Sequence, residues 1–250
     1  MGFSANLGFL WTELELPAAI RAAANASFDA VEFHWPYETP TADVSAALAE
    51  TGMACLGLNT LRGDLGNGEN GLAALPGRSH EARAAIDQAI AYADAVDAGA
   101  VHVMAGFASG PDAHQHFIEN LKYAVGQTSR TILIEPLNRH DAPGYFLERV
   151  AQAQAVIDAV AADNLKIMFD CYHVARTEGD VLTRFKDLLD HIGHVQFAAS
   201  PSRGTPDHGE IDYQWLLPAL KEAGWKGHFG AEYKPAGPTE ASLGWMKKLG

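Results

Sequence analysis

Residues 131–135 read TILIE, and a short apolar run that ends in a polar residue returns three times further along the chain. The later runs are KIMFD at 166–170, GHVQFA at 193–198 and HFGAEYK at 228–234. Because successive side chains of a strand point to opposite faces, each run has one wholly apolar row. The other row carries Glu135, Asp170, Gln196 and Glu232 in turn, about one strand–helix unit apart. These runs predict parallel strands that are covered by helices on one face.

The same alternation of short apolar runs and longer Ala-rich runs extends from end to end. We predict eight strands at 3–8, 29–34, 53–59, 100–105, 131–135, 166–170, 192–198 and 228–233. We predict eight helices at 15–26, 41–51, 79–98, 112–129, 147–161, 179–190, 212–223 and 239–248. This pattern predicts an α/β chain that forms a single (β/α)8 TIM barrel, one domain over residues 1–250. A doubly wound open sheet is the alternative, although it rarely needs eight such regular units.

Proline and glycine mark the predicted helix boundaries. Pro17 and Pro111 fit helix starts, where a missing N–H costs little. Four glycines fit helix ends just before strands: Gly52, Gly99, Gly193 and Gly224. We see no linker, no low-complexity segment and no shift in composition along the chain.

Composition excludes several classes of protein. Apolar residues make up 48% of the chain and charged residues 20%, which excludes disordered, collagenous and coiled-coil chains. The formal net charge of −13 makes nucleic acid and anionic membranes unfavourable partners. Cys55 and Cys171 build no disulfide scaffold, and no apolar run is long enough to cross a membrane. We therefore expect a cytoplasmic protein.

In a barrel, the polar row faces the axis and its last residues meet at the C-terminal mouth. Glu135, Asp170, Gln196 and Glu232 are therefore expected to converge there. Buried carboxylates need a compensating charge, and oxygen ligands favour Mg²⁺ or Mn²⁺ over Zn²⁺. The sequence predicts a divalent metal site made by these four residues. The alternative is a set of barrel-core carboxylates that are paired with Arg, Lys or His.

The same strand ends carry a family resemblance, together with motifs spread over the whole chain. The motifs are Phe3-Ser4-Ala5-Asn6-Leu7, Val31-Glu32-Phe33 with Pro36-Tyr37, Gly63-Asp64, Pro76-Gly77-Arg78, Ile134-Glu135-Pro136-Leu137-Asn138, Pro143-Gly144-Tyr145, Phe169-Asp170-Cys171-Tyr172-His173, Gly209-Glu210-Ile211-Asp212-Tyr213 and Gly230-Ala231-Glu232-Tyr233-Lys234-Pro235. With these motifs the chain resembles the hydroxypyruvate isomerase family of the xylose-isomerase-like barrels.

The resemblance implies a metal-dependent isomerase in which Glu135 and Glu232 are both metal ligands and catalytic groups. They would move a proton between C2 and C3 of a small hydroxy-oxo acid, converting hydroxypyruvate to 2-hydroxy-3-oxopropanoate (tartronate semialdehyde) through an enediolate. This chemistry needs an acid–base pair and a cation but no nucleotide cofactor. The substrate is a carboxylate and needs a cation, for which Lys234 and Arg203 are the candidates. His173 is the candidate for binding the substrate hydroxyl, and Asn59 is a further candidate substrate-binding residue. Each of the charged candidates is equally compatible with a surface or supporting role.

One departure from the family pattern and one further motif bear on this interpretation. Asp207-His208 stands where we expect a glycine-rich turn, and puts an acid and an imidazole near the predicted mouth. Gly66-x-Gly68-x-x-Gly71 matches a dinucleotide fingerprint as a string, but no helix follows it directly. We interpret residues 60–78 as a loop at the mouth.

Four other functions are weighed against the hydroxypyruvate isomerase. The first is an isomerase of four-carbon 2-oxo-tetronates or a related sugar isomerase or epimerase of the same barrel family. The second is a Schiff-base aldolase that uses Lys234, and the third is an abasic-site endonuclease, which the acidic charge disfavours. The fourth is a barrel that only binds a sugar acid or a metal. Trp215, Trp225 and Trp245 are expected to be exposed on late helices, which would suit a homo-oligomer.

Overall fold

Nine parallel strands form one sheet in the structure, a computed structural model that describes residues 1–249. The strands are β1 (Phe3–Asn6), β2 (Ala30–Glu32), β3 (Ala54–Cys55), β4 (Leu58–Asn59), β5 (Ala100–His102), β6 (Thr131–Ile134), β7 (Leu165–Asp170), β8 (Ile192–Phe197) and β9 (Phe229–Ala231). Their order in the sheet is β3-β2-β1-β9-β8-β7-β6-β5-β4. Every pair of neighbours is parallel, which requires a crossover connection between paired strands that follow one another in the chain.

The first and last strands in this order, β3 and β4, are consecutive in the chain, so the sheet closes into a barrel between them. β3 pairs with β2, whereas β4 pairs with β5. Around the break between them, Leu56 N–H donates to Val31 O at 2.8 Å and Thr60 N–H donates to His102 O at 2.9 Å. The predicted third strand, 53–59, is therefore split in two, and the predicted (β/α)8 TIM barrel fold is confirmed.

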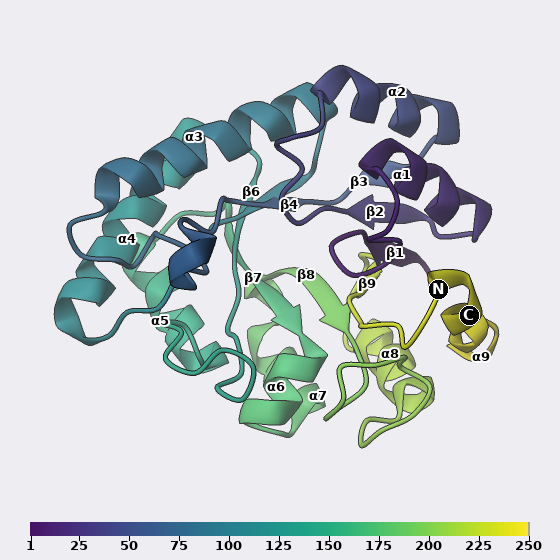
Figure 1. The fold of residues 1–250 in the computed structure, drawn as a ribbon. Helices are drawn as coiled ribbons and strands as arrows, with labels where there is room; N and C mark the ends of the chain where they lie inside the picture. Colours follow the sequence, from purple (N-terminus) through teal and green to yellow (C-terminus); the bar gives the residue numbers. More distant parts are fainter. Residues whose placement is uncertain (250) are drawn as a thin grey trace.

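Helices surround the strands on the outside of the ring (Figure 1). They are α1 (Leu16–Asn25), α2 (Thr41–Thr51), α3 (Ser79–Val96), α4 (Gly110–Gln127), α5 (Val150–Val160), α6 (Cys171–Thr177), α7 (Val181–Leu188), α8 (Tyr213–Glu222) and α9 (Met246–Leu249), with 3-10 turns η1 (Leu65–Asn67), η2 (Leu189–His191) and η3 (Thr239–Trp245). The helix predicted at 239–248 is thus mostly 3-10. None of the helices within residues 1–249 is long and apolar enough to cross a membrane.

Local chemistry explains most helix boundaries and corrects two of them. Pro17 and Pro111 lie in the first turns of α1 and α4, and Gly52 ends α2 with φ 69°. Gly99 and Gly193 are not helix ends, contrary to the prediction. Asp97 takes the left-handed conformation after α3, whereas Gly193 lies inside β8.

Helix α6 was not predicted, because it follows β7 with no loop between them. The carboxylate of Asp170, the last residue of β7, accepts a hydrogen bond from Tyr172 N–H at 2.8 Å and so caps the helix. A residue predicted only as a metal ligand thus also starts a helix. This turn brings the next residues, including His173, back over the mouth of the barrel.

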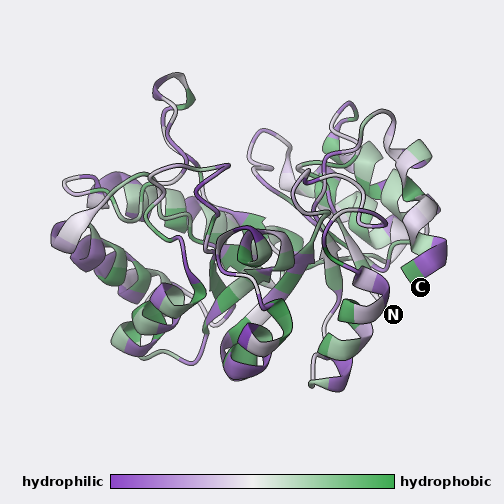
Figure 2. Cartoon of the chain, turned by 90° about the horizontal axis from the view of Figure 1, so that it is seen from below, coloured by the Kyte–Doolittle hydropathy of each residue, from purple (hydrophilic) through white to green (hydrophobic). Residues whose placement is uncertain are grey.

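The strand rows divide as the alternation predicts. The outward row is fully buried under the helices and includes Ile132, Ile134, Ile167, Phe169, Val195, Phe197 and Phe229. Each such side chain contributes about 1.5–3 kcal/mol to folding. On the inward row, Leu133 and Met168 form a small separate cluster with Ala100. Figure 2 shows hydrophilic and hydrophobic residues alternating along the helices, as expected for helices with one face on the sheet.

Two of the three tryptophans expected on the surface are buried. Trp245 is 0% exposed and packs edge-on against Phe3 and Phe197, and Trp225 is 9% exposed and donates to His228 O. The expectation was wrong because Trp245 in η3 packs against aromatic residues of β1 and β8, and Trp225, which follows α8, packs against Phe185 of α7. Only Trp215 of the three is exposed, at 59%, so a homo-oligomer stays a prediction with less to support it.

Candidate active site

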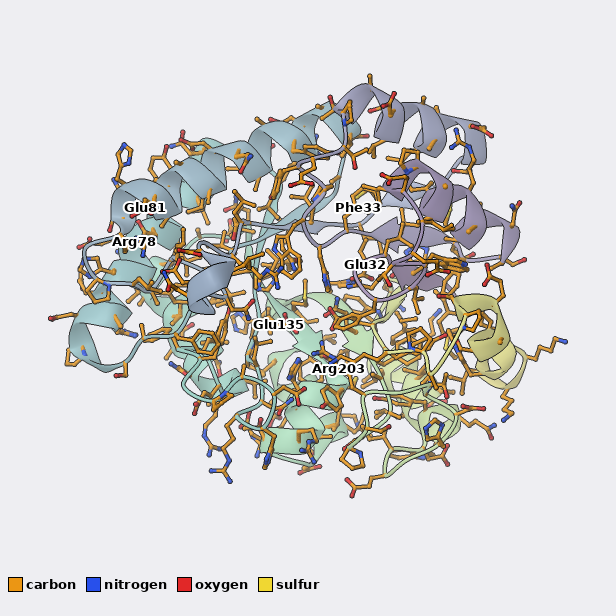
Figure 3. All side chains as sticks on the ribbon, viewed as in Figure 1. Glu32, Phe33, Arg78, Glu81, Glu135 and Arg203 are labelled. Atoms are coloured by element: carbon orange, nitrogen blue, oxygen red, sulfur yellow. The ribbon has the colours of Figure 1, made fainter. Side chains whose placement is uncertain are left out.

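Glu135, Asp170, Gln196 and Glu232 lie at the same end of four neighbouring strands. Asp170 closes β7 opposite Gln196 of β8, and Gln196 in turn lies opposite Gly230 of β9. Glu135 and Glu232 follow directly after β6 and β9. All four side chains are buried, with at most 7% of the residue exposed. The predicted convergence at the C-terminal mouth is therefore present, and Figure 3 shows Glu135 and Arg203 toward the middle of the ring.

Three of these four residues present a buried oxygen that lacks a hydrogen-bond partner. The atoms are Glu135 Oε1, Asp170 Oδ2 and Gln196 Oε1, and His173 Nε2 is in the same condition. Buried polar atoms without partners are rare in folded proteins. Four such atoms at one mouth therefore form a donor set that a bound cation would fit.

Glu135, Asp170 and His173 form a group whose ligand atoms all lie within 4.8 Å of one another. His173 Nε2 is 3.8 Å from Glu135 Oε1 and 3.6 Å from Asp170 Oδ2. His173 was predicted to bind substrate, whereas the structure places its ring among the candidate metal ligands. Two carboxylates and an imidazole suit a divalent cation, so the residues present fit a metal ion.

The protein offsets the charges of this group only in part, through the nearby Arg203. Burial, and then the charge of Glu232, raises the pKa of Asp170 to about 7. Burial together with the charges of Glu232 and Asp170 raises the pKa of Glu135 well above its usual range. Burial and the nearby Arg203 lower the pKa of His173 to about 3, which leaves its ring neutral and able to ligate. A divalent cation would reverse the penalty on both carboxylates.

Glu232 stands in different surroundings, because protein groups satisfy both of its oxygens. Its Oε1 accepts from Asn6 Nδ2 at 3.1 Å and lies 3.0 Å from His34 Nε2. Its Oε2 accepts from Arg203 Nη2. Although burial acts in the opposite direction, Arg203 and His34 lower the pKa of Glu232 to about 2. Glu232, predicted as a metal ligand and catalytic group, and Arg203, predicted to bind substrate, therefore form an ion pair with each other.

The predicted substrate-binding residues lie at different depths. The Arg203 guanidinium is 4.0 Å from Asp170 Oδ2 and lies over the rings of Phe9 and Tyr172. Lys234 is exposed, with its ammonium 5.8 Å from the Phe9 ring. Asn59 lies inside the barrel, where its Oδ1 is 3.2 Å from His102 Nδ1.

The sequence analysis missed Asn6, Phe9 and the pairing of His34. Asn6 ends β1 on the inward row, so the rule that found Glu135 and Asp170 would also have found it. Phe9 and His34 lie beyond strand ends, where alternation no longer tells the direction of a side chain. Asp207 accepts a hydrogen bond from Lys248 of α9 at 2.7 Å, and His208 beside it is 57% exposed in its side chain.

The mouth loop 60–78 carries the short turn η1, which the Asp64 carboxylate caps by accepting from Gly66 N–H. Gly71 has φ 118° and forms a bridge with Ala105, and α3 begins only at Ser79. Arg62 stacks on the Trp35 ring at 3.6 Å. The glycines of this stretch therefore serve a loop and not a phosphate-binding helix start.

Known proteins resemble the chain over nearly all of its length. A model of the family described as xylose isomerase-like TIM barrel matches residues 20–249. The chain is 41% identical to a 2-oxo-tetronate isomerase of Cupriavidus necator, covering 98% of this chain and 97% of the relative. It is 38% identical to a hydroxypyruvate isomerase of Escherichia coli with the same coverage. A solved structure described as an AP endonuclease, family 2, from Brucella melitensis superposes with a TM-score of 0.95 at 34% identity, covering 98% of each chain.

Proposed function

Because the chain belongs to the xylose isomerase-like TIM barrel family, we propose that it is a metal-dependent isomerase of small hydroxy-oxo acids. It is an enzyme of the isomerase type, similar to the hydroxypyruvate isomerases. The proposed reaction interconverts hydroxypyruvate and 2-hydroxy-3-oxopropanoate. The observation that supports it most is the set of buried, partnerless oxygens on Glu135, Asp170 and Gln196.

The reaction moves protons and leaves the carbon skeleton unchanged. One proton leaves C3, one joins C2, and the hydroxyl hydrogen passes from O3 to O2, through an enediolate. A bound Mg²⁺ or Mn²⁺ would supply positive charge to stabilise the developing oxyanions. The protein must then provide one ionised base and one acid on the two reacting carbons.

The two glutamates suit these opposite roles, because they reach the mouth from different strands and have different partners. Glu232 is held ionised by Arg203 and His34, so it is the base that accepts the proton from C3. Glu135 follows β6, separated from β9 by β7 and β8, so it approaches the substrate from another side of the mouth and is the group assigned to protonate C2. In the reverse direction the two exchange roles. Arg203 and Lys234 are the cations available for the substrate carboxylate.

A four-carbon 2-oxo-tetronate is the second candidate substrate, since the relative at 41% identity is a 2-oxo-tetronate isomerase. The two candidates differ by one carbon and share the reacting atoms. Abasic DNA is a weaker candidate, because a formal charge of −13 repels a phosphate backbone.

The test is turnover by metal-stripped protein, with and without Mn²⁺ or Mg²⁺, followed by proton NMR in D₂O. We expect metal-dependent turnover of hydroxypyruvate or of a 2-oxo-tetronate, with deuterium entering the product at C2. The higher kcat/KM identifies the substrate. Asp170→Asn is the matched control and should be inactive with either metal. Full activity in the metal-stripped protein, or cleavage of abasic DNA without either isomerisation, would overturn the proposal.

A further inference from the structure

The carboxylate of Glu32 is buried beside the candidate metal ligand Gln196 and contacts four side chains at once. Glu32 ends β2 and is 4% exposed. Ser4 Oγ donates to its Oε1 at 2.7 Å, and Gln196 Nε2 donates to its Oε2 at 2.7 Å. His194 Nε2 is 3.1 Å from both oxygens, and Asn6 Nδ2 is 3.5 Å from Oε2. No role in proton transfer or substrate binding uses this cluster.

We propose that Glu32, together with His194, is a positioning pair that fixes the amide of Gln196 with its oxygen toward Glu135 and Asp170. The inference rests on the proposed function, because it concerns how the chain prepares its metal site. Glu32 itself touches neither metal nor substrate. It acts through Gln196, the one neutral residue among the four predicted ligands.

An amide can be turned in two ways, and only one of them leaves an oxygen for a cation. A carboxylate is an acceptor only, so it binds the NH₂ end of the amide and repels the oxygen end. With Nε2 held by Glu32, Gln196 Oε1 points away and is buried without a partner. The reversed amide would set two oxygens against each other and aim N–H groups at the metal site.

His194 is the second partner of this buried carboxylate, because its Nε2 lies within hydrogen-bond distance of both Glu32 oxygens. It lies two residues before Gln196 in β8, so both side chains point into the barrel. Strand β8 therefore provides both the proposed ligand, Gln196, and His194, which contacts the orienting carboxylate of Glu32. Supporting contacts of this kind typically change metal affinity by roughly 10- to 100-fold when they are removed.

Gly230 of β9 provides the space for this cluster. A Cβ at this position would lie 2.3 Å from Glu32 Oε1, 2.9 Å from His194 Nε2 and 3.0 Å from Gln196 Cγ. The backbone of Gly230 does not have positive φ, so the absence of a side chain serves packing and not chain direction. Glu32, His194 and Gln196 therefore all lie close to Gly230.

The first experiment measures Mn²⁺ binding to metal-stripped protein by titration calorimetry. Glu32→Gln should weaken binding about 10- to 100-fold. Ser4→Ala is the matched control, because it removes a hydrogen bond to the same carboxylate without touching the amide, and it should change affinity less than about threefold. Folded Glu32→Gln with wild-type affinity would overturn the inference. If wild-type protein binds no Mn²⁺, it is the proposed function that fails.

A second measurement needs no metal, so it tests the positioning role of Glu32 independently of the proposed function. In ¹⁵N-labelled, metal-free protein, the Gln196 side-chain NH₂ signal is assigned by its loss in Gln196→Glu. We expect this signal to shift strongly in Glu32→Gln and little in Ser4→Ala. A signal that is unchanged by Glu32→Gln would show that Glu32 does not hold the amide.

Two further variants cover a Glu32→Gln protein that does not fold. Gly230→Ala should weaken Mn²⁺ binding and move the same NH₂ signal, whereas Gly126→Ala, where a Cβ meets nothing within 4 Å, should do neither. The double change Glu32→Gln with Gln196→Glu reverses donor and acceptor and should recover affinity that Gln196→Glu alone loses. Equal affinities of Gly230→Ala and wild type, or no recovery in the double variant, would count against the positioning role.

Discussion

The two halves of the barrel mouth treat their carboxylates in opposite ways. On the side of β9, β1 and β2, Glu232 is bonded by Asn6, His34 and Arg203, and its pKa is lowered to about 2. On the side of β6 and β7, Glu135 Oε1 and Asp170 Oδ2 are buried without partners. The pKa values of both residues are raised. Burial is similar on both sides, so the difference comes from the neighbouring groups: Arg203 and His34 lower the pKa of Glu232, whereas the charge of Glu232 raises the pKa of Glu135 and Asp170.

This contrast shows which part of the site the protein completes by itself. The paired half is ready as a base and needs no further ion. The unpaired half carries an electrostatic penalty that Arg203 offsets only in part and that a bound cation would remove, so folding stability is lost there to prepare a binding site. The predictions below test the two halves separately.

The largest effect is expected from Glu232→Gln in the paired half. The amide is nearly isosteric but cannot accept a proton, so we expect kcat to fall roughly 10³-fold. Steady-state kinetics with circular dichroism as a check on folding would measure it. Glu222→Gln, an exposed change on α8, should be neutral. A Glu232→Gln enzyme with near wild-type kcat would remove Glu232 from the mechanism.

Arg203→Met should lower kcat/KM about 100-fold and move the pH profile, because it breaks a buried ion pair. Without the guanidinium, burial raises the pKa of Glu232. The ionised base is then lost at a higher pH, and the acid limb of the profile shifts upward. Arg203→Lys, which keeps the charge, should shift the limb less. An unshifted limb in Arg203→Met would contradict the pairing of the two groups.

In the unpaired half, Asp170→Asn should stabilise the metal-free protein while abolishing metal binding. Between about pH 4 and 7 the unfolded chain has lost a proton that folded Asp170 keeps, so the stability of metal-free wild type falls as pH rises through this window. Asparagine carries no charge and can still cap α6. We expect a gain of roughly 2 kcal/mol at pH 8 that vanishes near pH 4.

Denaturant unfolding of metal-free protein at both pH values would measure this gain. Asp158→Asn on the exposed face of α5 is the control and should change little. A loss of stability at pH 8 in Asp170→Asn would mean that the unpaired half is not strained by its charges.

The smallest effect is expected from Lys234→Met at the rim. This ammonium is exposed and lies over the Phe9 ring, so water screens its attraction to a substrate carboxylate. We expect KM to rise about fivefold with kcat unchanged, a cost of about 1 kcal/mol. Lys226→Met, another exposed lysine, is the control. A large fall in kcat would instead give Lys234 a part in the chemistry.

Strand alternation is sufficient to predict the barrel and the level of the site. Glu135, Asp170, Gln196 and Glu232 are identified by their row and by their place at strand ends, both of which are local features of the sequence. The split of 53–59 into β3 and β4 and the capping of α6 by Asp170 were not predictable. Both depend on how the ring closes and how the chain leaves it, which local sequence does not specify.

The sequence by itself determined which residues face the barrel axis, because side-chain direction in a strand repeats every two residues. It also determined that several carboxylates meet at the barrel axis and need a compensating charge. Only the tertiary structure decided which acids are paired: Arg203 comes from the loop after β8, His34 follows β2 and Asn6 ends β1. Glu32, Gln196 and Gly230 likewise meet only when β2, β8 and β9 share one ring. Pairing depends on distances of a few ångströms between segments far apart in the chain, and folding alone sets those distances.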